Sequence, residues 1–171
     1  MERRAIYAGS FDPPTFGHFD VIRKMSALFD VIHVVVADNT RKKTLFTVEE
    51  RVKLFQDALA KTSLPSRVEV QSHDGLIIDF ARAHKAGFLI RGIRAVSDYE
   101  NELHLAMMNR KIAPEIETVL VMADEKHFFV SSSLVKEVAF HGGPLGDFVP
   151  PNVETTLKKK FAQEGGSKNG P

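Results

Sequence analysis

The chain has 171 residues, of which 43% are hydrophobic and 26% charged, a balance typical of one soluble globular domain. Its 23 lysines and arginines nearly cancel its 22 aspartates and glutamates, so no global charge favours nucleic acid or a membrane surface as a partner. The absence of cysteine excludes a disulfide scaffold, a thiolate metal site and a cysteine nucleophile. No apolar run reaches the roughly 18 residues of a membrane span, and no signal-peptide core follows the first residues, so a cytoplasmic protein is expected.

Short apolar runs alternate along the chain with segments of helical periodicity. The runs at 5–8, 31–37, 68–70, 88–91 and 118–122 predict five strands. Helices are predicted at 19–29, from the capping box Thr47–Glu50 to Leu59, at 76–85, 98–112 and 133–140, and from an Asn152 cap to Phe161. In the helix over 98–112, the side chains expected to face the core are Tyr99, Leu103, Ala106 and Met107.

This alternation predicts an α/β fold, a Rossmann-like doubly wound sheet of five parallel strands with helices on both faces. A single domain is expected over 1–162, with a disordered tail over 163–171. The loops at 9–17, 38–46, 91–97 and 123–132 all follow predicted strands. They are therefore expected to gather at one edge of the sheet, where folds of this class bind ligands.

The loop after the first strand, Gly9-Ser10-Phe11-Asp12-Pro13-Pro14-Thr15-Phe16-Gly17-His18, is the most informative segment. It leads into a helix, whose first N–H groups and dipole favour a bound phosphate. Gly9 lets a ligand approach the backbone, and Gly17 lets the loop close onto the helix. His18 stands in the first helical turn, where an imidazole can reach a phosphate. On this loop alone, a plain connector is an equally good interpretation.

Three later segments carry groups suited to anionic ligands. Arg91-Gly92-Ile93-Arg94 pairs two guanidinium groups around a glycine, although surface arginines are the commoner explanation of such a pair. Arg41-Lys42-Lys43 is either a solvated charge run or a cationic clamp. The three serines of Phe129-Val130-Ser131-Ser132-Ser133-Leu134-Val135-Lys136-Glu137 are either redundant helix caps or a phosphate site.

Taken together, these segments resemble one enzyme family. Thr15-Phe16-Gly17-His18 is similar to the H-x-G-H motif of the nucleotidylyltransferase superfamily, in its T-x-G-H form. The wider string resembles the opening of bacterial phosphopantetheine adenylyltransferases. The R-G-x-R segment at 91–94 and the S-S-S-x-V-K-E segment at 131–137 follow in the family's order, so the resemblance runs from about Arg4 to Phe161. The chain departs from the family pattern at Ala8, Pro14, Phe16 and His127-Phe128.

The resemblance implies transfer of AMP from ATP to 4′-phosphopantetheine, giving dephospho-coenzyme A and pyrophosphate. It implies catalytic roles for His18, Lys42 and Arg91, and acceptor binding by Ser10, Lys42, Ile77 and Arg91. The implied ATP-binding residues are Ser10, Phe11, His18, Gly92, Ile93, Arg94, Glu102, His127, Phe128, Phe129, Val130, Ser131, Ser132 and Ser133. Mg²⁺ is expected to arrive with ATP, without a protein metal site. A homohexamer and feedback inhibition by coenzyme A are further expectations.

The acceptor phosphate is already an anionic nucleophile, so catalysis is expected to rest on positioning and charge neutralisation rather than on a general base. Two other functions stay open. One is a related nucleotidylyltransferase that uses CTP with glycerol phosphate or ATP with nicotinamide mononucleotide. The other is a non-catalytic nucleotide-binding module on the same fold. Glu100 and His104, one helical turn apart, are interpreted as a solvated pair rather than metal ligands, and His33 as a structural histidine.

Overall fold

The computed structural model describes residues 2–38 and 43–165. Its sheet consists of β1 (Arg4–Gly9), β2 (Val31–Ala37), β3 (Arg67–His73), β4 (Phe88–Ile93) and β5 (Glu117–Met122). These five strands are all parallel and lie in the order β3-β2-β1-β4-β5. The predicted α/β fold with a five-stranded parallel sheet is therefore confirmed.

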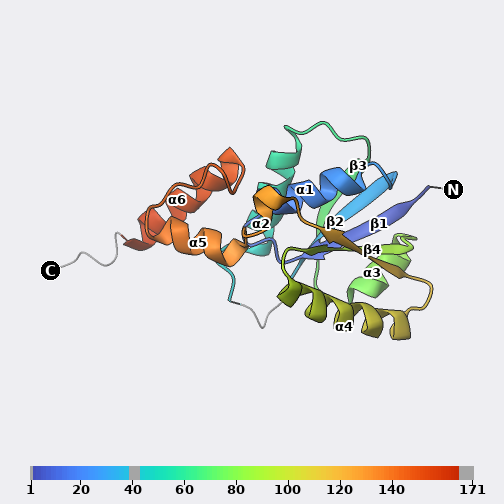
Figure 1. The fold of residues 1–171 in the computed structure, drawn as a ribbon. Coiled ribbons are helices and arrows are strands. Elements are labelled where there is room, and N and C mark those ends of the chain that lie inside the picture. Colours follow the sequence, from blue (N-terminus) through green and yellow to red (C-terminus); the bar gives the residue numbers. More distant parts are fainter. Residues whose placement is uncertain (1, 39–42, 166–171) are drawn as a thin grey trace.

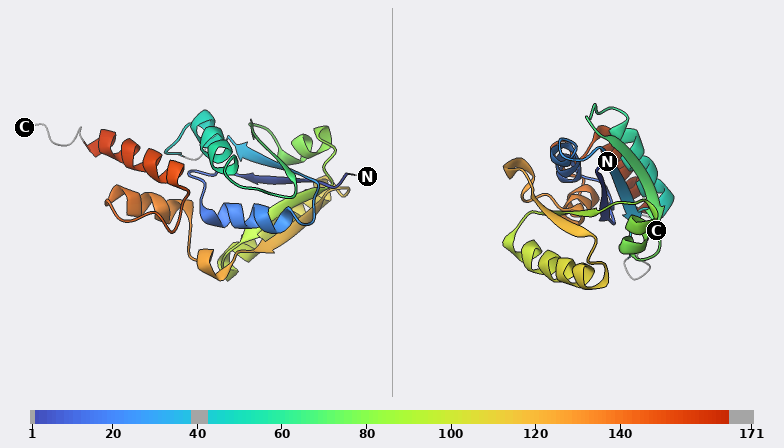
Figure 2. Two further views of the ribbon diagram at one scale, coloured as in Figure 1. Left: turned by 90° about the horizontal axis from the view of Figure 1, so that it is seen from above. Right: turned by 90° about the vertical axis from the view of Figure 1, so that its right-hand side faces the viewer.

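Helices cover both faces of this sheet (Figure 1). On one face, α1 (Phe16–Met25) and α2 (Val48–Leu59) pack Val21, Ile22 and Phe55 against alternate strand residues. On the other face lie α3 (Ile77–Ala83) and α4 (Val96–Ile112). Two further helices, α5 (Ser132–Phe140) and α6 (Pro151–Gly165), pack together beyond the carboxyl edge of the sheet, where Figure 2 shows them extending from it. A single 3₁₀ turn, η1 (Glu125–His127), precedes α5.

The strand order reverses at β1. The chain leaves β1 to form β2 and β3 on one side, then returns to place β4 on the other side. The loops after β1 and β4 consequently diverge and leave a crevice between their strands, which is where ligands bind in open α/β sheets. Strands β1 and β4 pair next to this crevice, with Tyr7 opposite Ile90.

Several element boundaries differ from the sequence-based expectation. Helix α1 begins at Phe16 rather than at 19, because Thr15 takes the extended N-cap conformation directly after the two prolines. It ends at Met25 rather than at 29, and the turn that follows buries Phe29 in the core. Strand β3 is longer than 68–70 and carries polar, half-exposed residues, as befits the edge of a sheet.

The last helix also differs from the prediction. It begins at Pro151, and Asn152 lies inside it rather than capping it, with its side-chain amide donating to the Leu54 carbonyl at 3.0 Å. The helix continues to Gly165, so residues 163–165 are helical and not part of a disordered tail. Within the described parts of the chain, no helix has both the length and the apolar character needed to cross a bilayer.

Four side chains of α4 are predicted to face the core, and this prediction is wrong for two of them. Leu103 and Ala106 are partly buried, but Tyr99 is 47% and Met107 63% exposed. Among the α4 side chains that the structure describes, none is fully buried. Apolar residues surround the whole helix rather than forming one face, so periodicity alone could not orient it.

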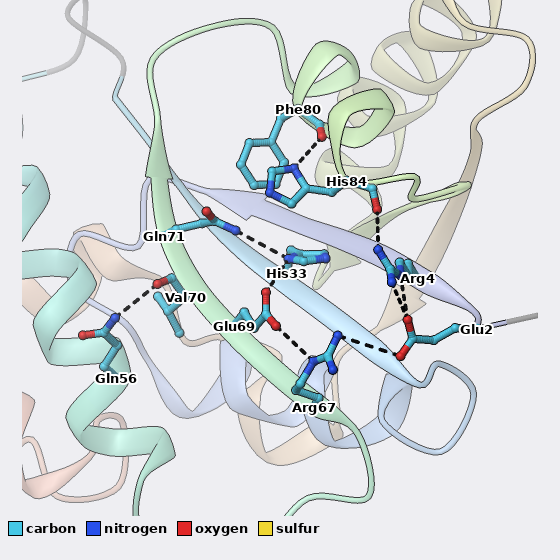
Figure 3. A network of polar contacts seen from close by, with 10 residues as sticks. All are labelled: Glu2, Arg4, His33, Gln56, Arg67, Glu69, Val70, Gln71, Phe80 and His84. Carbon is cyan, nitrogen blue, oxygen red and sulfur yellow. Dashed lines mark hydrogen bonds and ion pairs between the residues drawn. The ribbon is translucent and has the colours of Figure 1, made fainter.

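His33 is a structural histidine in a polar network on the α3 side of the sheet (Figure 3). Its Nδ1 lies 3.2 Å from the Glu69 carboxylate and 3.5 Å from the Gln71 amide, while its Nε2 is buried and has no partner among the described residues. The ring packs 4.8 Å, centroid to centroid, from His84, which stacks on Phe80. Burial lowers the pKa of His33, and Glu69 opposes this effect only in part.

Candidate active site

A cavity of about 350 Å³ opens at the carboxyl edge of β1 and β4. We call it the polar cavity, because hydroxyl, imidazole, guanidinium and carboxylate groups line it. It brings together groups from the loop after β1, the start of α1, the end of β4 and the start of α5. The predicted site residues among its lining are Ser10, Phe11, His18, Arg91, Gly92, Arg94, Glu102, Val130, Ser131, Ser132 and Ser133. Segments up to 123 positions apart in the sequence thus meet around one space.

His18 is held in a defined orientation at the start of α1. It is the third residue of the helix, and its Nδ1 lies 2.9 Å from the backbone nitrogen of Thr15. Because a backbone N–H can only donate, Nδ1 must accept, and in the neutral ring the proton lies on Nε2. Burial, assisted by the charge of Arg94, lowers the pKa of His18 to about 3. At neutral pH this residue therefore offers one N–H donor in the wall of the polar cavity.

The loop that precedes α1 is shaped by Phe11. This residue has a left-handed backbone, with φ of 46°, and its buried ring makes edge contacts with Tyr7, His18 and Phe55. A Cβ at Gly9 would lie only 2.9 Å from the Phe11 ring. Any other residue at position 9 would therefore have to displace this buried ring, so the packing of the loop itself favours glycine there; the close approach of a ligand stays a prediction.

The side chain of Arg91 is oriented by a carboxylate of the protein itself. Its Nε and Nη2 donate to the two oxygens of Glu102 at 2.6 and 2.7 Å, and its Nη1 donates to the Ala8 carbonyl at 2.9 Å. Three of the five N–H bonds of this guanidinium are thus used, which leaves two by count for an anion. Glu102 thus orients Arg91, and because it also lines the polar cavity, its expected contact with ATP stays a prediction.

Arg94, the residue directly after β4, is held in a similar way. Its side chain pairs with Asp98 at 3.1 Å, and its Nη1 donates to the Val130 carbonyl at 3.0 Å. Burial alone would raise the pKa of Asp98, but hydrogen bonds from the Arg94 main chain and side chain lower it. The contact with Val130 ties β4 to the segment that leads into α5.

The three serines at the start of α5 have different surroundings. Ser131 is the N-cap, and its hydroxyl accepts the Leu134 N–H at 3.1 Å. The Ser132 hydroxyl donates to the Pro13 carbonyl at 2.8 Å. Ser133 is exposed. All three nevertheless line the polar cavity, where the first N–H groups of the helix add donors and positive potential.

Other predicted residues lie elsewhere. Lys42 falls outside the described residues. Ile93 is buried beneath the site, and Ile77 lines a different cavity. His127 packs beside Phe16 and Gly17, while Phe128 and Phe129 are 49% and 60% exposed. None of these last three is among the residues that line the polar cavity.

A second cavity, of about 300 Å³, adjoins the first on the α3 and α4 side of the sheet. Its lining is mostly apolar, and we call it the apolar cavity. The side chains that define it come from the start of α3 and from α4, namely Leu76, Ile77, Leu105 and Met108. Ala8 and Arg91 line both cavities. A ligand that spans the two would therefore pass Arg91 at their junction.

Sequence reasoning missed three residues that build the site. Arg51, only 1% exposed, donates to the main-chain carbonyls of Thr47, Ser10 and Ala37, and no carboxylate in the described part of the chain pairs with it. Asp12 is a buried carboxylate. Tyr7 lines the polar cavity, and burial raises the pKa of its hydroxyl, which therefore stays protonated. Asp12 lies in the glycine-containing loop, Tyr7 lies in the strand before it, and Arg51 is the residue directly after the capping box.

The expectation that Mg²⁺ arrives with ATP, without a protein metal site, stays a prediction. Within residues 2–38 and 43–165, no group of three histidines or carboxylates lies close enough to hold an ion. Among the described residues that line the polar cavity, Glu102 is the one carboxylate, and both of its oxygens accept hydrogen bonds from Arg91.

Solved structures with the same fold come from nucleotide-handling proteins. One is a Vibrio parahaemolyticus protein assigned as a nicotinate-nucleotide adenylyltransferase, with 18% identity, a TM-score of 0.65, and coverage of 96% of this chain and 94% of that one. Plasmodium falciparum nicotinic acid mononucleotide adenylyltransferase is also 18% identical. Its complex with NaAD gives a TM-score of 0.70 and covers 94% of this chain and 96% of its own. Its complex with APC gives a TM-score of 0.69 and covers 95% of this chain and 96% of its own.

At this level of identity the structural likeness shows the fold alone. The assignment comes from the sequence family. A model of the cytidylyltransferase-like family matches residues 6–138, which include the loop after β1, His18, the two cavity arginines and the serines that begin α5. The chain belongs to the cytidylyltransferase-like family of nucleotidyltransferases.

Proposed function

We propose that the protein transfers the adenylyl group of ATP to 4′-phosphopantetheine, giving dephospho-coenzyme A and pyrophosphate. Family membership supports nucleotidyl transfer, and the resemblance in the phosphate-binding segments favours this acceptor. The observation that carries the acceptor assignment is the apolar cavity next to the polar one. An acceptor with a phosphate at one end and a long, largely uncharged arm would bind both.

The arm of the acceptor would lie against Leu76, Ile77 and Met108. Its phosphate would then be near Arg91, where the two cavities meet. A mononucleotide acceptor carries no comparable arm and would leave this apolar surface uncovered. The nucleotide would then bind in the polar cavity, beside His18 and the N-terminus of α5.

Catalysis in this proposal depends on positioned donors. The phosphate oxygen of the acceptor attacks the α-phosphorus of ATP, and pyrophosphate leaves. The Nε2–H of His18 donates to the α-phosphate as negative charge builds there, while Arg91 holds the acceptor phosphate. Arg94 and the serines at 131–133 hold the ATP phosphates. Lys42 completes the set by neutralising charge between the two anions.

Mg²⁺ would be bound through ATP. The polar cavity presents mainly hydrogen-bond donors, and its carboxylate is paired with arginine, so its chemistry suits phosphates better than a bare cation. When bound with ATP, the ion neutralises charge on the phosphate oxygens.

The test is pyrophosphate release from ATP and Mg²⁺ with 4′-phosphopantetheine, beside ATP with nicotinamide or nicotinic acid mononucleotide and CTP with glycerol 3-phosphate. We expect release only with phosphopantetheine, together with dephospho-coenzyme A. Release in another mixture would replace the acceptor and keep the nucleotidyl transfer. Nucleotide binding without release in any mixture would favour a non-catalytic module.

Two neighbouring methionines of α4 provide a matched pair for the acceptor assignment. Met108 lines the apolar cavity and Met107 does not, although the two are similarly exposed at 58% and 63%. Met108→Glu places a charge against the uncharged arm and is expected to raise the KM for phosphopantetheine about tenfold or more, with the KM for ATP unchanged. Met107→Glu is expected to leave both values near those of the wild type. Equal effects of the two substitutions would contradict the assignment.

A further inference from the structure

We propose that Asp12 and Lys136 are positioning residues that couple the two substrate sites, through a partly buried ion pair that joins the loop after β1, the segment before α2, and α5. The proposal rests on the proposed function for what the sites bind. It concerns residues that lie behind the polar cavity and do not line it.

The centre of this junction is the carboxylate of Asp12, whose side chain is 5% exposed. One oxygen accepts the backbone N–H of Phe46 at 2.9 Å. The other accepts the backbone N–H of Leu45, also at 2.9 Å, and the ammonium of Lys136 at 2.7 Å. A buried carboxylate needs such partners, because an unpaired charge in this environment would be costly.

Each partner belongs to a segment that the proposed function uses. Asp12 lies two residues after Ser10. Leu45 and Phe46 end the loop that contains Lys42, immediately before the N-cap of α2. Lys136 lies in the second turn of α5, whose first residues line the polar cavity. One carboxylate therefore joins the acceptor side of the site to the nucleotide side.

A second contact shows that α5 is attached to the loop after β1 by more than one side chain. The Ser132 hydroxyl donates to the carbonyl of Pro13, the residue next to Asp12. Two donors of α5, on residues 132 and 136, thus bind consecutive residues of the loop. They lie one helical turn apart, so together they fix the axis of the helix as well as its distance from the cavity.

The geometry separates the expected effects of two substitutions. Lys136→Met removes the ammonium but leaves both backbone N–H groups on Asp12, so it removes one of the two attachments of α5 and spares the acceptor side. Asp12→Asn removes the charge and replaces one acceptor oxygen with an N–H₂ group, which faces either the Phe46 N–H or the Leu45 N–H and Lys136 ammonium, so it disturbs both sides. Lys136→Met is therefore expected to raise the KM and Kd of ATP about tenfold with the acceptor KM within about twofold, and Asp12→Asn to raise the KM of both substrates.

The control is Lys53→Met, which removes an ion pair of 3.0 Å with Asp57 on an exposed face of α2. It should change neither KM, since an exposed pair on one helix does not join segments of the site. Lys136→Arg restores the charge and is expected to return the ATP Kd to within about threefold of wild type. If Lys136→Met does not fold, Lys136→Gln carries the same expectation.

The experiment measures the Kd of Mg-ATP by calorimetry and both KM values by pyrophosphate release, with the folded state of each variant checked by circular dichroism. A folded Lys136→Met or Lys136→Gln variant with the wild-type Kd for ATP would overturn the proposal, as would one in which the acceptor KM rises as much as the ATP KM. Calorimetry needs no acceptor. If the wild type fails to use phosphopantetheine, the acceptor assignment fails while the ATP titration still decides the role of the ion pair.

Discussion

The two nitrogens of His18 have different tasks, and two substitutions can separate them. Nδ1 accepts the Thr15 N–H at 2.9 Å and so completes the start of α1, while the Nε2–H is the donor proposed for the α-phosphate. In His18→Asn the amide oxygen lies close to the former position of Nδ1, so the cap is kept and the donor is lost. In His18→Gln the amide nitrogen lies close to that of Nε2, so the donor is kept and the cap is lost.

The size of each effect follows from these roles. Loss of one donor to the developing charge lowers kcat on the order of 10²–10³, or about 2.7–4 kcal/mol of transition-state stabilisation. His18→Asn is therefore expected to show this fall, with its free energy of unfolding within about 0.5 kcal/mol of wild type. His18→Gln should lose about 1 kcal/mol of stability, the usual value of a helix cap, and less than about tenfold in kcat.

The assays are pyrophosphate release under saturating ATP and acceptor, and urea unfolding followed by circular dichroism. A His18→Asn variant with kcat within tenfold of wild type would refute the catalytic role of Nε2. Equal losses of kcat in the two variants would show that the ring acts through the helix start rather than on the phosphate.

Three further predictions concern binding, pH and assembly. Arg91→Ala should raise the acceptor KM about tenfold or more and the ATP KM much less, as measured by initial rates; an unchanged acceptor KM would contradict its position between the cavities. Burial lowers the folded-state pKa of His33, so its stabilising effect is present above the unfolded value of about 6.5 and is lost as pH falls toward the folded pKa. Urea unfolding should therefore show less stability at pH 5.5 than at 7.5, and His33→Gln should make this slope shallower; an unchanged slope would refute it. The family resemblance implies a homohexamer, and the exposed Val96, Tyr99 and methionines of α4 are available for contacts between chains; light scattering is therefore expected to give a mass six times the 19.1 kDa of one chain, and the mass of a monomer would contradict this expectation.

The sequence was most informative where local chemistry alone decides the structure. The nearly continuous β-branched run at 31–37 matches β2 residue for residue, since a strand buried on both faces needs no alternation. The capping box at Thr47 marked the start of α2, and both of its hydrogen bonds are present. The first-turn position of His18 followed from its spacing after the glycine-containing loop.

Tertiary context accounts for what the sequence did not reveal. The exposure of Tyr99 and Met107 depends on how α4 lies over the sheet, and apolar residues on all sides of this helix gave no direction. The pairing of Arg91 with Glu102 joins two predicted residues in a contact that spacing could not indicate. Asp12 and Arg51 act on main-chain groups of other segments, and such partners have no signature in a sequence.

The contacts of Arg51 have a consequence for how the specificity of such a site can change. Its guanidinium donates to two main-chain carbonyl oxygens. One belongs to Ser10 in the loop after β1, at 2.7 Å, and the other to Ala37 at the end of β2, at 3.1 Å. Every amino acid supplies that oxygen. The backbone course of the loop is therefore independent of which side chain stands at position 10 or 37, so substitutions there can alter the chemistry offered to an acceptor while the frame that presents it stays in place.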